Sequence, residues 1–260
     1  MQRKIFLFII LLQCIVVSSN SQVLKNFSLG IDIGRNYSTA TLNNKWAVRQ
    51  DVGTYYDSNS GNSMLNNNLN LGYFSLKPSF NIFDERFTVA SGLRIQFVDS
   101  EMTKAGSGSR NFFYLRYNSS ISRTDFARVT QISESNVYLG IPLEISYNVF
   151  QYGNFGAHLM LGAEAGYRVK SKAFIGFYDE GMTNQINEVM NGVDVSSNRL
   201  ISSVYASVGA NYNQNNKVIY KIDFLLPSKY LTKNNSSLLD FENFSGIQFS
   251  ISFLLNKNNN

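Results

Sequence analysis

The chain has 260 residues and a formal net charge of +5 at pH 7, and 44% of its residues are hydrophobic. Because the excess of basic residues is mild and scattered, we expect no nucleic-acid partner. The single cysteine, Cys14, lies in the first apolar segment, so the remainder of the chain has no disulfide and no thiol chemistry.

Residues 1–21 have the features of a signal peptide. Arg3 and Lys4 supply a short positive start, an apolar run follows, and small residues stand just before Gln22. The apolar run is too short for a comfortable membrane span, and no later stretch approaches the roughly 18 apolar residues of a membrane helix. We therefore expect a signal peptide at 1–21 and one β domain at 22–260.

The rest of the chain alternates apolar and polar residues with a period of two. Side chains of a β-strand point to opposite faces in turn, whereas a helix would scatter the same pattern around its surface. The clearest segments are 137–149 and 155–170, joined by a turn at 151–154. In chain order, the predicted strands cover about 27–34, 69–82, 86–98, 137–149, 155–170, 199–212, 217–227 and 246–255.

The predicted connections are short and long in strict alternation. In an up-and-down barrel this order places all short turns at one end and all long loops at the other, as in outer-membrane barrels with periplasmic turns and extracellular loops. The short connections are 84–85, 151–154 and 213–216, and the long ones are about 43–67, 100–135, 171–198 and 229–244.

The sequence predicts an all-β fold, an eight-stranded antiparallel up-and-down transmembrane β-barrel. Alternation alone does not say which face looks inward, and a secreted lipocalin-like barrel would have an apolar interior. The polar face, however, is rich in glycine, serine and opposite charges, and aromatic residues cluster near the strand ends, as in a membrane-interface belt. We expect a location in the outer membrane of a Gram-negative bacterium, in contact with outer-membrane lipid.

Charged side chains of the polar face are expected to fill the lumen. Eight strands enclose an interior that side chains can fill, and unpaired buried charges are costly, so these groups should form an ion-paired plug. The expected members of this polar network are Asp32, Lys77, Arg94, Glu144, His158, Glu164, Arg168, Lys221 and Asp223.

His158 is the only histidine, and it shares the polar face with Glu164 and with Ser146 of the neighbouring strand. A Ser–His–acid hydrolase needs such groups within hydrogen-bond reach. Glu164 is six residues away, roughly 20 Å along a strand, so we favour a structural lumen histidine. A membrane-embedded hydrolase acting on lipid or peptide and a narrow pore are the two alternative functions.

Four stretches resemble a known family: FSLGIDIG at 27–34, LGIPLEISY at 139–147, GAEAGY at 162–167 and GIQFSISFLL at 246–255. They are similar to segments of the small outer-membrane β-barrel proteins of the Bacteroidota, the PorT-like family. The resemblance implies a membrane barrel. Because some members belong to the type IX secretion machinery, it also implies envelope or secretion proteins as partners.

The sequence shows no convergent catalytic set and no metal-ligand spacing, so we expect a non-enzymatic barrel without cofactor or metal. Its long loops, or its periplasmic face, would dock a partner. Exposed aromatic residues in the loops are the first candidates for docking: Phe112, Phe113, Tyr114, Phe174, Phe177 and Tyr178.

Overall fold

The structure is a computed structural model that describes residues 27–43, 48–49, 65–82, 86–104, 112–119, 124–193, 197–215 and 217–255. The expected signal peptide at 1–21 and the short connection at 84–85 lie outside these ranges.

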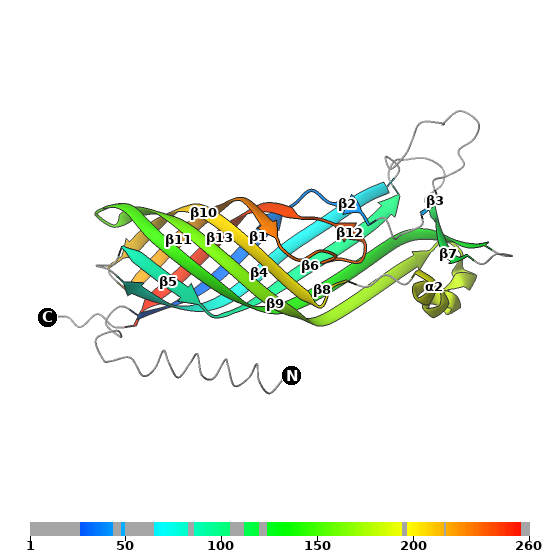
Figure 1. The fold of residues 1–260 in the computed structure, drawn as a ribbon, viewed down its shortest axis with the longest axis horizontal. Coiled ribbons are helices and arrows are strands. Elements are labelled where there is room, and N and C mark those ends of the chain that lie inside the picture. Colours follow the sequence, from blue (N-terminus) through cyan, green and yellow to red (C-terminus); the bar gives the residue numbers. More distant parts are fainter. Residues whose placement is uncertain are drawn as a thin grey trace, which may run out of the picture.

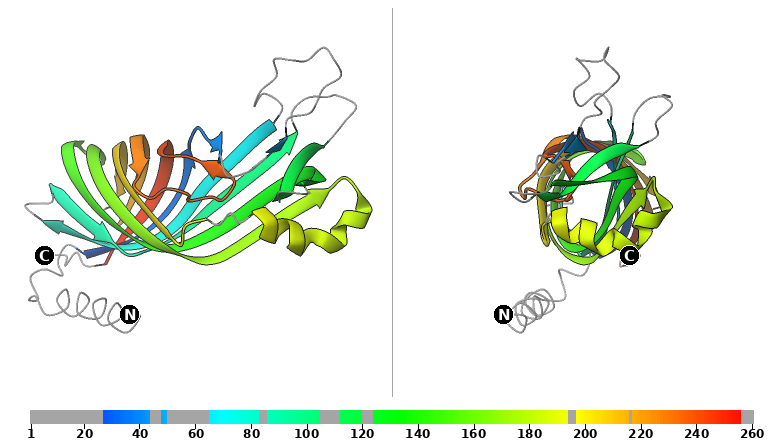
Figure 2. Two further views of the ribbon diagram at one scale, coloured as in Figure 1. Left: turned by 45° about the vertical axis from the view of Figure 1, so that its right-hand side comes forward. Right: turned by 90° about the vertical axis from the view of Figure 1, so that its right-hand side faces the viewer.

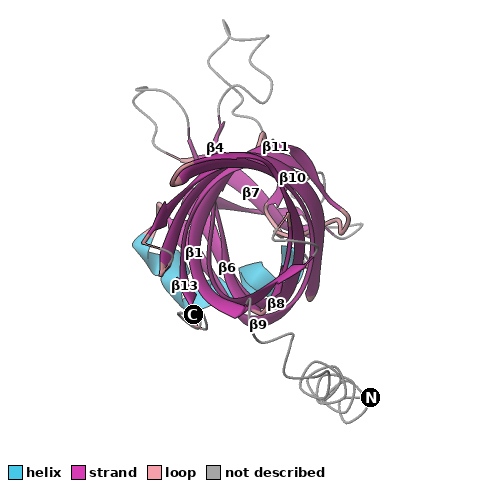
Figure 3. Ribbon diagram, turned by 90° about the vertical axis from the view of Figure 1, so that its left-hand side faces the viewer, coloured by secondary structure: helices cyan, strands magenta, loops and turns pink. Residues whose placement is uncertain are grey.

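The described strands close into a barrel, which confirms the predicted fold class (Figures 1 and 3). All neighbouring strands are antiparallel, and β1 pairs with both β4 and β13, so the ring is complete. Strands β5 and β6 follow one another and share the position between β4 and β8. The ring consists of β1 (Phe27–Tyr37), β4 (Leu65–Ile82), β5 (Phe87–Ser91) with β6 (Leu93–Lys104), β8 (Thr124–Tyr152), β9 (Phe155–Phe177), β10 (Leu200–Gln214), β11 (Val218–Tyr230) and β13 (Asn243–Leu254).

The hairpin between β8 and β9 is tighter than the four-residue turn expected at 151–154. Its two strands extend to Tyr152 and from Phe155, so two residues make the turn. Gly153 has φ +57°, a left-handed conformation that glycine adopts without steric cost. We call this end of the barrel the turn end and the opposite end the loop end.

Apolar side chains cover the outside of the barrel, and polar side chains line its inside. On β8 the outward residues Leu139, Ile141, Leu143 and Ile145 are 43–53% exposed. Inward residues such as Asp32 are almost fully buried. Water would favour the reverse arrangement, because exposed apolar area is costly there, whereas hydrocarbon favours the observed one. The outer face of the strands therefore contacts lipid.

The apolar band ends at a defined level on the loop-end side. Outward positions change from Phe97 to Asp99 on β6 and from Val137 to Ser135 on β8. Between Val137 and Val149, at about 3.3 Å per residue and a tilt of about 45°, the outward apolar row covers roughly 28 Å, enough for the band of about 25 Å in such barrels.

Aromatic pairs mark the turn-end limit of the band. The ring centroids of Phe87 and Tyr147 are 4.9 Å apart, and those of Phe155 and Tyr212 are also 4.9 Å apart. Tyr152, at the tip of the hairpin, is 84% exposed. Aromatic rings at this depth lie where the amphipathic side chains of a membrane-interface belt are found.

Several strands continue far beyond the band at the loop end (Figure 2). β8 has 29 residues and β9 has 23, whereas a membrane strand needs about 9–11. We call this extension the head, defined as residues 112–119, 124–135 and 172–193. It contains β7 (Phe113–Ser119), which pairs with β8 and with β3 (Val48–Arg49), and the helices η3 (Glu180–Gln185) and α2 (Ile186–Val193).

The prediction of loops at 100–135 and 171–198 is therefore wrong where β6, β7, β8, β9 and the two helices occupy them. The register of β8 and β9 shifts between Val129 and Gln131 and again between Val137 and Tyr138. Each extra residue exchanges the inward and outward faces of the strand. The apolar residues consequently move from odd to even positions, or the reverse, at each shift. The apolar–polar alternation of the membrane part therefore does not continue unbroken into the head.

The head has its own apolar core, and this core contradicts part of the docking prediction. Phe112 and Phe113, expected to be exposed, are only 8% and 5% exposed. Helix α2, which the sequence did not predict, buries Val189 in the same core. The core residues are Met102, Phe113, Leu115, Ala127, Val129, Ile132, Ile175, Val189, Leu238 and Leu239.

The last long connection folds inward instead of forming the extracellular loop expected at 229–244. We call residues 231–242 the cap. Within it, β12 (Leu239–Asp240) pairs with β2 (Thr41–Leu42), and Leu238 and Leu239 are buried in the head core. The cap is thus a packed part of the loop end.

Candidate functional site

The interior of the barrel at membrane level is an ion-paired plug centred on Arg94 of β6, which is 2% exposed. Its Nη2 donates to Glu144 Oε1 of β8 at 2.9 Å, and its Nη1 donates to Glu164 Oε2 of β9 at 2.8 Å. Its Nε donates to Ser75 Oγ at 2.7 Å, and the guanidinium carbon lies 4.2 Å from the ring centroid of Tyr73. One side chain therefore links strands on different sides of the lumen.

Lys77 of β4 extends the plug to β1. Its Nζ lies 2.5 Å from Asp32 Oδ2 and also pairs with Glu144. From the opposite wall, the hydroxyl of Tyr205 on β10 donates to Glu144 Oε1 at 2.7 Å. Because the charged groups are paired across the lumen, the plug avoids the large cost of isolated buried charges.

His158 belongs to a separate pair nearer the turn end. Its Nε2 lies 2.8 Å from Asp223 Oδ1 of β11, and both side chains are 2% exposed. Ser207 Oγ donates to the same carboxylate oxygen at 3.0 Å. The partners considered from sequence, Glu164 and Ser146, are not those of the histidine, since Glu164 binds Arg94. The hydroxyl of Ser207 contacts the acid and not the imidazole, which is not the order that a hydrolase triad needs.

Two glycines make room for these groups. A side chain at Gly162 would overlap the ring of Tyr205. A Cβ at Gly209 would lie 2.5 Å from Asp223 Oδ1 and 2.6 Å from His158 Nε2. The glycines of the polar face therefore allow large side chains from neighbouring strands to cross the lumen.

The space left between the two groups is small. Asp32, Lys77, His158, Lys221 and Asp223 are among the residues that line a cavity of about 30 Å³. Lys221 lines it without an ion pair to any carboxylate in the described ranges. Such a space holds no more than a few water molecules, so the lumen has no wide aqueous channel at this level.

A second layer closes the loop end, where the cap meets the strands. Glu134 of β8 is 4% exposed and accepts hydrogen bonds from Ser236 Oγ at 2.8 Å and from the Ser237 backbone N–H at 2.6 Å. Ser236 Oγ also lies 2.7 Å from Ser100 Oγ of β6. The Tyr138 hydroxyl donates to the Asn235 carbonyl at 3.0 Å. These contacts fix the cap across the opening.

Arg168, expected in the polar network of the lumen, lies at this rim and contacts polar groups there, not the charged groups of the plug. Its Nη1 donates to the Ser197 carbonyl at 2.9 Å and also contacts Ser197 Oγ. Ser197 Oγ in turn donates to Asn136 Oδ1 at 3.4 Å. Residues that share the inward face of a strand can thus lie at different depths in the barrel. The alternation of apolar and polar residues predicts the face of a residue but not its depth.

The head holds the aromatic docking candidates in different environments. Arg128 Nε donates to Asp179 Oδ2 at 2.7 Å, and this hydrogen bond raises the pKa of Arg128 above its ordinary value. The guanidinium lies over the rings of Phe112 and Tyr178. Tyr178 and Phe174 are each 51% exposed. Tyr114 is half-buried, and Phe177 packs against the head core.

The described ranges contain neither a metal-binding cluster nor a membrane-spanning helix. No group of three histidine, cysteine, aspartate or glutamate side chains there is placed to hold a metal ion. No helix there combines the length and apolar character needed to cross a bilayer.

These features define the class of the protein, an integral β-barrel protein of a Gram-negative outer membrane. A closed barrel satisfies every backbone polar group inside hydrocarbon, which an open sheet cannot do. The antiparallel ring, the outer apolar band and the polar interior are those of outer-membrane barrels.

The chain matches no established protein family and no curated protein. Among solved structures, it is similar to the outer membrane protein OprG of Pseudomonas aeruginosa, with 10% identity over 88% of this chain and 96% of that chain and a TM-score of 0.37. It is also similar to Ail, the attachment invasion locus protein of Yersinia pestis, with 11% identity over 86% and 96% and a TM-score of 0.24. The transport unit of the autotransporter AIDA-I of Escherichia coli gives 10% identity over 91% and 92% and a TM-score of 0.25.

Proposed function

We propose that the protein is a non-enzymatic, non-conducting outer-membrane barrel that holds the head outside the cell, where the head docks a protein of the cell envelope. The observation that carries the proposal is the double closure of the lumen, by the plug around Arg94 and by the cap over Glu134. A barrel closed twice is suited to anchoring and not to transport.

The position of His158 supports a non-enzymatic function. The histidine and Asp223 are buried inside the lumen, where no lipid or peptide substrate can reach them. The closed lumen likewise disfavours a narrow pore, since the charges that could line a path are paired with one another.

The head supplies the surface for docking. From Thr124 to Ser135, β8 extends roughly 40 Å along its axis beyond the apolar band. Phe174 and Tyr178 expose large rings on this extension, and aromatic residues are enriched at the energetic centres of protein interfaces. The hydrogen-bonded pair of Arg128 and Asp179 holds the chain next to Tyr178 in place.

More specifically, we propose that the protein is one of the PorT-like barrels of the Bacteroidota and that its partner is a component of a secretion system. It is supported by the LGIPLEISY and GAEAGY stretches, which form the paired membrane segments of β8 and β9.

The closed lumen predicts electrical silence. We expect the purified barrel to give no steady conductance in planar lipid bilayers, because both closures would have to open for ions to pass. An open porin inserted under the same conditions provides the positive control. Discrete, persistent conductance steps from this chain would contradict the proposal.

Docking by the head predicts site-specific cross-links. A photo-reactive amino acid at position 174 or 178, introduced in cells, should cross-link an envelope protein that mass spectrometry then identifies. The same probe at Lys217, which is exposed at the turn end, is the matched control. Identical products from all three positions, or none from the head positions, would count against docking there.

A further inference from the structure

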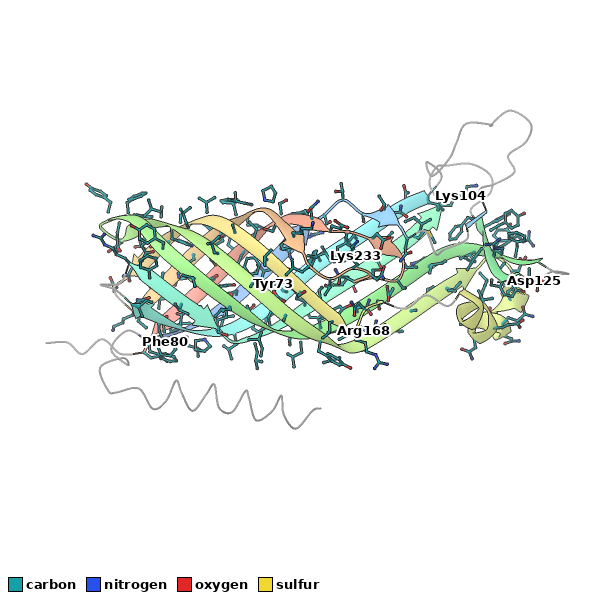
Figure 4. All side chains as sticks on the ribbon, in the orientation of Figure 1. Tyr73, Phe80, Lys104, Asp125, Arg168 and Lys233 are labelled. Carbon is teal, nitrogen blue, oxygen red and sulfur yellow. The ribbon has the colours of Figure 1, made fainter. Side chains whose placement is uncertain are left out.

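Exposed basic side chains gather on one side of the barrel, next to the loop-end limit of the apolar band. We call this group the basic arc: Lys170 and Lys172 of β9, Arg199 before β10, Lys229 of β11 and Lys233 of the cap. The three strands are consecutive neighbours in the ring. Figure 4 shows Arg168 and Lys233 at similar distances along the barrel, both nearer the loop end than Tyr73.

Contacts bring the members of the arc together. The Arg168 backbone N–H donates to the Arg199 carbonyl at 2.8 Å, which places Arg199 beside the part of β9 that carries Lys170. Asn198 Nδ2 donates to the Lys233 carbonyl at 3.4 Å, which brings the cap residue next to Arg199. Lys229 pairs in register with Val204 of β10. The arc is therefore a continuous surface formed by three strands and the cap.

The charge of the arc is largely uncompensated. Within the described ranges, Lys229 forms an ion pair with Glu242 at 3.9 Å, and the other four members form none. The Lys229–Glu242 pair is exposed, with side chains 59% and 54% accessible, and such pairs are weak.

The part of the barrel beyond β8 has a different character at the corresponding positions. There the first outward polar residues of β4 and β6 are Asn70 and Asp99, which pair with one another in register, followed by Glu101. Asp99 is two strands from Lys172, with Ser135 of β8 between them. Arg35 of β1, in register with Gly72 of β4, is also exposed at this level, so the positive charge is concentrated at the arc and is not spread evenly around the barrel.

Exposed apolar residues lie directly beside the arc. Tyr167, Leu200 and Leu231 are 52%, 56% and 59% exposed, and Leu200 pairs in register with Tyr167. A row of apolar side chains next to basic ones fits a lipid whose acyl chains contact the former and whose anionic headgroup contacts the latter.

We propose that the basic arc binds the phosphate groups of a phosphorylated glycolipid in the outer leaflet of the membrane. Lysine and arginine are the side chains that bind phosphate, and their place at the edge of the apolar band matches headgroup depth. This interaction uses basic residues near the apolar band, of which only Lys172 also belongs to the head, and not the exposed rings Phe174 and Tyr178 proposed for docking. It adds a specific lipid to the partners of the barrel.

The test uses the full chain in detergent micelles and native mass spectrometry. The probes are bis-phosphorylated lipid A and the same glycolipid with both phosphates removed. We expect the phosphorylated form to bind preferentially, and the double variant K170Q/K172Q to weaken this binding roughly tenfold. The variant R86Q/K217Q removes the same charge from exposed positions at the turn end and should bind as the unmodified chain does.

Folding of each variant is checked by its shifted electrophoretic migration before and after heating. A second pair, R199Q/K229Q, tests the arc without changing β9 and should also weaken binding of the phosphorylated lipid. Equal binding of the two glycolipids, or an equal loss in the R86Q/K217Q variant, would overturn the proposal while leaving the conductance and cross-linking tests unaffected.

Discussion

Replacing Arg94 by alanine is expected to lower the free energy of unfolding of the barrel by about 3–5 kcal/mol, the cost of removing one partner from a buried ion pair. The substitution leaves Glu164 without its ion pair and removes one of the two cations that pair with Glu144. The substitution also removes a contact that three strands share, because Arg94 donates hydrogen bonds to side chains of β4, β8 and β9. Urea-induced unfolding, followed by electrophoretic migration, measures the change.

Arg116→Ala is the matched control, because Arg116 is an exposed arginine of the head. The double variant R94M/E164Q should recover part of the lost stability, since it removes the uncompensated carboxylate together with its partner. If Arg94→Ala unfolded at the same urea concentration as Arg116→Ala, the plug would be energetically irrelevant to the fold.

The membrane part of the fold could be predicted from the sequence because its information is local. Each strand between the turns has one lipid-facing row, so period two alone identifies the segment and its outward residues, as for Leu143 and Leu161. The same pattern placed Asp32, Lys77 and Glu144 on one inward face, where the structure pairs them.

The contacts of the head and of the histidine could not be predicted in this way, because they depend on non-local register. Asp223 reaches His158 across two strand boundaries, and nothing near either residue in the sequence indicates the other. The bulge after Val129 exchanges the inward and outward faces of β8. A prediction that assumes one unbroken apolar–polar alternation therefore fails beyond this point.

The cap shows the same limit at larger separation. Serine-rich segments are typical of solvated loops, and the sequence predicts a long extracellular loop at 229–244, which contains Ser236 and Ser237. In the structure, both serines bind Glu134, 102 and 103 residues earlier in the chain. A buried carboxylate with two donors from one segment is a feature of the tertiary structure, and the serines alone do not reveal it.

Leu161→Arg is expected to prevent stable insertion of the barrel, or to lower its stability in a bilayer by about 2–4 kcal/mol, the cost of an arginine on the lipid face near the midplane. Leu161 lies on β9 opposite Ile145 and Ala206 and is 68% exposed on the outer face. In a water-soluble barrel the same change at such an exposed position would be neutral or favourable, because it replaces an apolar surface residue by a charged one. Folding into lipid vesicles, followed by resistance of the product to protease, measures the effect.

Phe174→Arg is the control for this substitution, because Phe174 is also a large, exposed, outward residue of β9 but lies in the head, beyond the apolar band. Its replacement should leave insertion unchanged, since its side chain faces water. The contrast between two similar residues of one strand separates the effect of membrane depth from a general intolerance of β9 to arginine. Equal insertion of both variants would mean that Leu161 does not face hydrocarbon, and the orientation of the whole sheet would then have to be reversed.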